Sequence, residues 1–289
     1  MNKMSKDQFF SGNIDFEIHG SDKLLKRVTS CDFFTNYIPD LSPSDKNYTD
    51  YKIYLSNSKN LSDPIKIDSK EATLGIADFF SDKDIISLID YVLEFWRQTV
   101  GVYTIHGSSC HKNGQAILMI GGASGIGKST LVYNLVKDAD FSFVGDEKIL
   151  LDENCHIIGG INRLGFNKST MDPTVENDWR SIKADDQVTT LDIRTIVQPV
   201  ISPGGDLIID KWNSTKINWH IYEELTRKIR GVSRRVATCI PIQSLDDNVI
   251  AKRRSEYASK LANNRQVQAF TIYGDVKKVT EFINKNFKC

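Results

Sequence analysis

The sequence lacks closely spaced pairs of cysteines. Its five cysteines are odd in number and scattered, and none forms a Cys-x-x-Cys pair: Cys31, Cys110, Cys155, Cys239 and Cys289. This arrangement argues against a disulfide framework and against a zinc site. It favours a protein kept in the reducing cytosol.

Net charge and long apolar runs are also missing. Lys and Arg number 37, as do Asp and Glu, so no bulk field would attract nucleic acid or an anionic membrane. No apolar run approaches the ~20 residues of a membrane span, and residues 1–10 contain Asp and Lys in place of an apolar signal core. We therefore expect a cytoplasmic protein without nucleic-acid or membrane partners.

The residues that are present have an ordinary globular composition, with 40% hydrophobic and 26% charged. A chain of 289 residues can form one large domain or two unequal ones. Short alternating segments at residues 14–18, 51–55 and 65–67 are separated by stretches rich in Ser, Asp, Asn and Pro. Such strands with turn chemistry between them predict a small β-rich N-terminal region over residues 1–81.

The rest of the chain, residues 82–289, alternates helical and strand patterns. Residues 82–100 predict an amphipathic helix, whose apolar face consists of Ile85, Leu88, Ile89, Val92 and Trp96. The later expected elements are strands at 141–147, 195–200, 207–209 and 267–273, and helices at 219–229, 248–261 and 275–287. This alternation indicates an α/β nucleotide-binding domain with no internal repeat.

One segment carries a chemical signature, the pattern G-x-x-x-x-G-K-[ST]. It comprises Gly122, Ala123, Ser124, Gly125, Ile126, Gly127, Lys128 and Ser129, followed by Thr130. An apolar run at 116–120 precedes it and a helical pattern at 130–136 follows, which is the strand–loop–helix context of a phosphate-binding loop. In such loops backbone N–H groups and the helix N-terminus face the phosphates. Lys128 would reach the β- and γ-phosphates, and the Ser129 hydroxyl would bind Mg²⁺.

The strand that enters this loop is expected to be the second arm of a hairpin. Residues 102–106 read as a strand, and Asn113-Gly114 is a strong hairpin signal because both residues tolerate positive φ. The sheet is therefore expected to be mixed, unlike a simple parallel unit.

A phosphate-binding loop also needs a carboxylate, to hold Mg²⁺ or to take a proton from an attacking hydroxyl. Asp146 ends the segment Phe143–Asp146 soon after the loop helix, whereas Asp210 ends the Walker-B-like run Leu207–Asp210. A strand that follows the loop helix directly can end beside the phosphates, so we favour Asp146. Asp210 stays open as the alternative.

Taken together, these motifs resemble the nucleotide-binding core of HPr kinase/phosphorylase and its related kinases. The resemblance covers roughly residues 100–160 and rests on Ile105-His106-Gly107, Asn113-Gly114, the glycine-rich loop and Val144-Gly145-Asp146-Glu147. The core of ATP-dependent phosphoenolpyruvate carboxykinase is similar but more distant. The resemblance implies an α/β fold of this type over residues 82–289, with a mixed sheet.

Site roles follow from the same resemblance. It implies that Asp146 acts as the base on the acceptor hydroxyl, with Lys128 and His106 as further catalytic residues. It places the loop residues and Thr130 on the nucleotide, and Ser129 with Glu147 on the metal.

The chain departs from the family pattern at two places. Thr130 follows the loop serine, where HPr kinases usually have Glu. The Glu-x-Arg-Gly-x-Gly signature is absent, and only Asn162-Arg163-Leu164-Gly165-Phe166 lies in that region. The metal-binding Glu of that signature has no match, with Glu147, Glu153 and Asp172 as the acids in reach along the chain.

These observations predict an ATP-dependent phosphotransferase that uses Mg²⁺ and phosphorylates a serine-type hydroxyl on a protein, peptide or small molecule. A nucleotide-binding switch or assembly ATPase without a dedicated acceptor is the alternative. A carboxykinase-like enzyme would need a metal-binding Lys and His set and a longer chain. Whether the chain forms a homo-oligomer is left open by the sequence.

Overall fold

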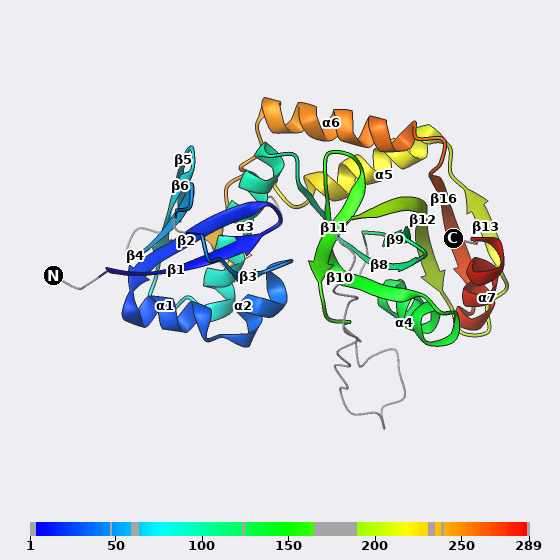
Figure 1. Cartoon of the computed structure of the whole chain (residues 1–289), viewed down its shortest axis with the longest axis horizontal. Helices are drawn as coiled ribbons and strands as arrows, with labels where there is room; N and C mark the ends of the chain where they lie inside the picture. Colours follow the sequence, from blue (N-terminus) through cyan, green and yellow to red (C-terminus); the bar gives the residue numbers. More distant parts are fainter. Residues whose placement is uncertain are drawn as a thin grey trace, which may run out of the picture. The chain divides into compact units, whose positions relative to one another are not determined.

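The computed structural model describes residues 4–46, 48–58, 64–122, 125–164, 190–230, 235–237 and 240–287. The chain divides into two compact units, and each is built from two separate stretches of sequence (Figure 1). The first unit contains residues 1–102 and 226–251, and the second contains residues 103–225 and 252–289. Each unit is an α/β structure with its own sheet.

The first unit has a six-stranded mixed sheet in the order β3-β1-β2-β4-β6-β5. Its elements up to residue 102 are β1 (Met4–Ser11), β2 (Ile14–Ser21), α1 (Asp22–Thr29), α2 (Asp32–Tyr37), β3 (Ser42–Pro43), β4 (Tyr51–Asn57), β5 (Ile65–Asp68), β6 (Glu71–Ile76) and α3 (Asp82–Thr99). Residues 226–251 add the short pair β14 (Arg235–Val236) and β15 (Ile240–Pro241). One hydrophobic core joins the sheet to all three helices.

The helix expected at residues 82–100 is confirmed as α3, and its start has a local cause. The Ser81 hydroxyl accepts from the Asp84 N–H, and the Asp84 carboxylate accepts from the Ser81 N–H, which is a capping box. The helix belongs to the first unit, however, so the expected boundary after residue 81 is wrong in placing it with the C-terminal domain. Residues 226–251 also belong to the first unit, and the N-terminal region contains α1 and α2 besides its strands.

The second unit has a mixed sheet in the order β11-β10-β8-β9-β12-β16-β13, with β7 paired to β10. Its strands are β7 (Tyr103–Ile105), β8 (Gly107–Lys112), β9 (Gln115–Ile120), β10 (Ser142–Leu151), β11 (His156–Ile161), β12 (Leu191–Ile201), β13 (Ile208–Lys211) and β16 (Gln268–Gly274). Its helices are α4 (Lys128–Asp138), α5 (Ser214–Thr226), α6 (Asn248–Ala262) and α7 (Val276–Asn286), of which α5 and α6 each have one end in the first unit.

Strand β9 shows how this sheet is buried on both faces. Ile117 and Met119 lie in the core that contains α4 and α7, whereas Leu118 and Ile120 lie in the core that contains α5 and α6. Alternate residues of a strand face opposite sides, so helices on both sides explain the continuous apolar run. The α/β class and the mixed sheet expected from the sequence are thereby confirmed.

The expected hairpin is also confirmed, with a different first arm. Strands β8 and β9 pair antiparallel around Asn113 and Gly114, whose φ angles are +52° and +77°. The first arm is β8, which starts at Gly107, whereas the strand expected at 102–106 is the separate strand β7.

Within the described residues, no helix is long and apolar enough to cross a lipid bilayer.

Candidate functional site

The glycine-rich segment, residues 122–129, connects β9 to α4 and includes the first two residues of that helix. Its placement at the C-terminal end of β9 matches the expected strand–loop–helix order. Gly127 is the N-cap residue of α4, with φ +103° and no side-chain hydrogen bond to the helix N-terminus. The first N–H groups of any helix have no partner within the helix itself, and a helix N-terminus carries partial positive charge. Ala123 and Ser124, two of the predicted nucleotide contacts, lie outside the described residues.

Neighbouring strand β12 holds this segment in shape. The Ile201 N–H donates to the Ile126 carbonyl at 3.0 Å. A Cβ on Gly127 would lie 2.3 Å from Cγ1 of Ile201, which is far below contact distance, and the positive φ adds strain for any other residue. The second glycine of the motif is therefore required by its packing against β12 as well as by its backbone angle.

Lys128 lies folded across the segment. Its side chain is buried, and its Nζ donates to the Gly121 carbonyl at 3.2 Å. Gly121 is the residue that directly follows β9. The ammonium group is therefore held against the backbone at the start of the loop, and its predicted contact with phosphates stays a prediction.

The structure brings Asp146 to this segment. The Asp146 side chain is buried, and its Oδ1 accepts from the Ser129 hydroxyl at 3.0 Å. The same oxygen accepts from the Ser108 hydroxyl. Residues on α4, β10 and β8 thus meet at one carboxylate oxygen, so Asp146 is the acid that stands beside the loop serine.

Asp146 does not end its strand, which corrects the expected strand at 141–147. Strand β10 continues to Leu151, and its pairing register shifts on both partner strands around Asp146. Glu147 has φ +65°, in the left-handed region that is uncommon for residues other than glycine. The acids therefore lie at a β-bulge in the middle of a long strand, and such bulges re-aim side chains.

His106 lies opposite this bulge, between β7 and β8. Its Nδ1 donates to the Glu147 carbonyl at 2.9 Å, and the Glu147 Oε2 lies 3.6 Å from the same nitrogen. A proton on Nδ1 leaves Nε2 of the neutral ring as an acceptor. His106 is therefore held against Glu147, the residue that follows Asp146. The predicted catalytic role of His106 and the predicted role of Glu147 as a metal ligand stay predictions.

The glycine after His106 has a packing reason. A Cβ on Gly107 would lie 2.5 Å from the Met119 carbonyl oxygen of β9. The His-Gly pair therefore marks the point where the chain passes close to the strand that enters the loop.

The alternative acid, Asp210, is not brought to the loop. It lies on the edge strand β13, which β12 and β16 separate from β9. Its side chain is exposed and forms an ion pair with Lys216 at 2.7 Å. The structure thus gives Asp210 the role of a solvent-facing strand residue.

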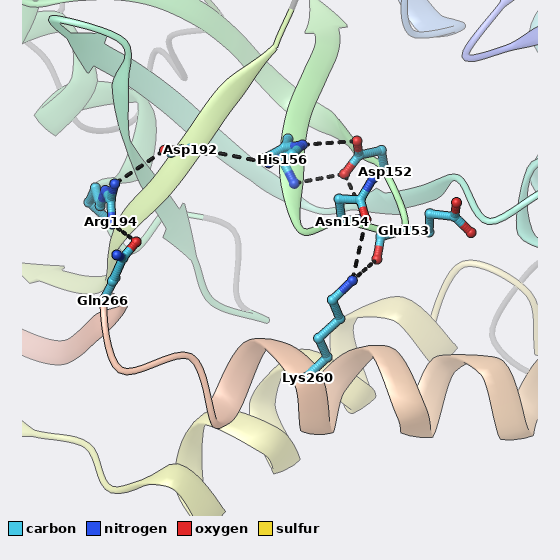
Figure 2. A network of polar contacts seen from close by, with 8 residues as sticks. All are labelled: Asp152, Glu153, Asn154, His156, Asp192, Arg194, Lys260 and Gln266. Carbon is cyan, nitrogen blue, oxygen red and sulfur yellow. Dashed lines mark hydrogen bonds and ion pairs between the residues drawn. The ribbon is translucent and has the colours of Figure 1, made fainter.

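The other acids considered for the metal do not join this site. Glu153 lies in the β10–β11 turn, where its backbone carbonyl accepts from Lys260 at 2.9 Å (Figure 2). Strand β11, which follows this turn, pairs with the N-terminal end of β12. Because β12 runs parallel to β9, this is the end of the sheet opposite the loop. Asp172 lies outside the described residues.

A second polar network lies at this end of the sheet. His156 lies between Asp152, at 3.1 Å from Nδ1, and Asp192, at 3.4 Å from Nε2. Figure 2 shows the chain of contacts continuing from Asp192 to Arg194 and Gln266. These side chains join β11, β12 and the loop between α6 and β16 at the end of the sheet remote from the glycine-rich segment.

Sequence reasoning missed Ser108. The available signal was its position two residues after His106 in a strand pattern, where residues i and i+2 share a face. This position points to Asp146 only once β8 and β10 are known to be neighbouring strands.

The site residues also fit Mg²⁺. A serine hydroxyl and a carboxylate at 3.0 Å are hard oxygen donors, and Mg²⁺ is usually held by one or two carboxylates together with substrate phosphates. Within the part of the chain that the structure describes, no three His, Cys, Asp or Glu side chains gather to hold a metal. The fit is therefore to a metal bound jointly with phosphate. Compared with protein-family models and with curated proteins, the chain matches none.

Proposed function

We propose that this protein is an ATP-dependent kinase that transfers the γ-phosphate to a hydroxyl group, as its resemblance to HPr kinase implies. The observation that carries the proposal is the contact between Ser129 and Asp146, at 3.0 Å. It joins the last residue of a phosphate-loop motif to the acid that the resemblance names as base. Both residues lie in the second unit, with Lys128 and His106.

In the proposed reaction, Asp146 takes the proton of the acceptor hydroxyl. The acceptor oxygen forms a bond to the γ-phosphorus, the bond from that phosphorus to the β,γ-bridging oxygen breaks, and ADP leaves with the electron pair. Lys128 and the backbone N–H groups of the loop bind the phosphates and stabilise the charge that develops on them. His106 helps to orient the acceptor, and its Nδ1 hydrogen bond to the Glu147 carbonyl supports this role by fixing the ring.

When bound, Mg²⁺ would neutralise charge on the phosphate oxygens. Ser129 would hold it, and the contact of its hydroxyl with Asp146 supports a share of this carboxylate in the site. The acceptor is a serine-type hydroxyl on a protein, a peptide or a small molecule.

The deciding experiment compares transfer with hydrolysis. Candidate acceptors, including peptides encoded by neighbouring genes, are incubated with the protein and γ-labelled Mg·ATP, and each is weighed by mass spectrometry. We expect one class of acceptor to gain the mass of a phosphoryl group faster than phosphate is released to water, because positioning beside the γ-phosphate can lower the barrier by about 7 kcal/mol or more. Partner-stimulated phosphate release with no phosphorylated acceptor would instead support the nucleotide switch.

A further inference from the structure

Ser108 is a buried side chain of the candidate site to which neither the motifs nor the family resemblance assigns a role. It lies on β8, is fully buried, and donates its hydroxyl to Oδ1 of Asp146. Ser129 donates to the same oxygen from α4. One carboxylate oxygen therefore has two serine donors from two different elements.

The two donors differ in what else they must do. In the proposed kinase, the Ser129 oxygen serves the metal that accompanies the nucleotide, so its contact with Asp146 has to adjust when nucleotide enters. Ser108 lies opposite Met119 of β9 and next to Ser109, which pairs with β10, and it has no motif role that would draw it away. Its hydrogen bond is the one that can stay in place throughout the reaction.

We propose that Ser108 is the positioning residue of Asp146, an inference that rests on the proposed function. The Ser108 hydroxyl fixes Oδ1, and with it the orientation of the carboxylate that takes the proton of the acceptor hydroxyl. Burial makes this bond hard to replace, because Asp146 is about as buried as Ser108 and a water molecule has little access to the vacated place.

The chain offers a matched control on the next residue. Ser109 is also fully buried on β8, but its hydroxyl donates to the Ile117 carbonyl of β9 at 2.9 Å. Adjacent strand residues face opposite sides of a sheet. Ser108→Ala and Ser109→Ala thus remove the same atom from the same strand, and only the first removes a bond to Asp146.

The test measures turnover of Mg·ATP, with water as the phosphate acceptor, for the wild type and both alanine variants. We expect Ser108→Ala to lower kcat about 10-fold or more, the loss typical of one hydrogen bond to a charged group. The KM for ATP should change less than about 3-fold, because the loop and Lys128 are untouched. Ser109→Ala should keep the wild-type kcat, and Ser108→Thr, which retains the hydroxyl, should recover most of the lost rate.

A double-mutant cycle separates positioning from general loosening of the site. If Ser108 acts through Asp146, Ser108→Ala should lower kcat no further in a protein that already carries Asp146→Asn. Full additivity, or equal kcat in Ser108→Ala and Ser109→Ala, would overturn the inference while leaving an active kinase. Should the alanine variant fail to fold, Ser108→Cys keeps the shape with a weaker donor and is measured in its place, with the same expected fall in kcat. A wild type that neither binds nor turns over ATP would instead overturn the proposed function.

Discussion

The charged side chain of Lys128 lies against the backbone of the loop. Its replacement tests whether this lysine serves ATP binding or the stability of the fold. Its Nζ contacts the Gly121 carbonyl, and it is a point charge for phosphate in the proposed function. We expect Lys128→Ala to abolish ATP binding or turnover while the far-ultraviolet circular dichroism spectrum stays that of the folded chain. Lys137→Ala, an exposed lysine on the same helix, is the control and should bind ATP normally. Equal ATP affinity in the two variants would refute the assignment of the loop.

The two candidate acids give a second comparison at single residues. We expect Asp146→Asn to keep ATP binding and to lower phosphate transfer at least ~100-fold, the size typical of losing a general base. Asp210→Asn should retain activity, because Asp210 is exposed and paired with Lys216 at the sheet edge. Steady-state rates and ATP affinities of both variants decide the matter. A larger loss in Asp210→Asn would place the chain with ordinary Walker-B ATPases.

The single residues of the site differ in how far the sequence could predict them. Lys128 and Ser129 are fixed by a contiguous motif, and Asp146 follows from its short distance along the chain to the loop helix. Ser108 and the left-handed Glu147 depend on a bulge and on which strands are neighbours. Those features come from packing between segments far apart in the sequence, which local patterns do not encode.

Among the elements, strands β1 and β2 are joined by a buried acid whose pKa is shifted. Burial raises the pKa of Glu17, but hydrogen bonds from Lys6, Gln8 and His19 outweigh it and bring the pKa from 4.5 to about 2. Lys6 and Gln8 lie on β1, at 2.8 and 2.7 Å from Oε1. A carboxylate with a lowered pKa stabilises the fold above its unfolded pKa, and this stabilisation is lost as the pH falls from about 4.5 toward 2.

Glu17→Gln should therefore destabilise the first unit at pH 7 by up to about 3 kcal/mol, taking ~1.4 kcal/mol per pKa unit as the scale. The difference from wild type should shrink as the pH drops below 4.5. Urea unfolding of both proteins at pH 7 and pH 3 measures this. Glu71→Gln is the control, since Glu71 is exposed and 3.6 Å from Lys52, and such surface pairs contribute less than ~1 kcal/mol. An equal effect of the two substitutions at pH 7 would contradict the prediction.

Elements with strong local signals were predicted, and those with weak signals were not. The Asn113-Gly114 turn and the caps at Ser81 and Asp275 mark their elements by backbone chemistry. Helices α1 and α2 have only 8 and 6 residues, too short for a clear helical period. Strand β11 contains two adjacent glycines, which weaken any strand pattern.

For the whole molecule, the division into units could not be predicted from local sequence. Val236, Ile240 and Ile242 complete the core of the first unit, although they follow the site residues by about 90 positions. The buried Tyr91 hydroxyl donates to the carbonyls of Ile229 and Gln243 in the same returning segment. Composition shifts and turns indicate where a domain boundary can lie, but they do not indicate that a later segment, such as residues 226–251, packs into an earlier unit.

The contribution of residues 226–251 to the core of the first unit predicts how fragments of that unit behave. Burying one such side chain stabilises a fold by about 1.5–3 kcal/mol, so losing three approaches the ~5–15 kcal/mol that holds a whole domain together. We expect residues 1–102 alone to lack a cooperative thermal transition. The same residues linked by a flexible tether to residues 226–251 should regain one. A folded 1–102 fragment, with sharp amide signals by nuclear magnetic resonance, would show that the returning segment is dispensable.

The interleaved course of the chain also constrains the order of events on the ribosome. The first unit lacks part of its core until residue 251 has been made, about 150 residues after its first stretch ends. At roughly 5–20 residues per second, that interval lasts about 7–30 seconds. During it, core side chains of the first unit lack their contacts with the returning segment and are open to chaperones and to neighbouring nascent chains. The second unit also awaits its last strand and helix, β16 and α7. Neither unit therefore has its full set of residues until synthesis has passed residue 251, and a premature stop before residue 252 leaves both units incomplete.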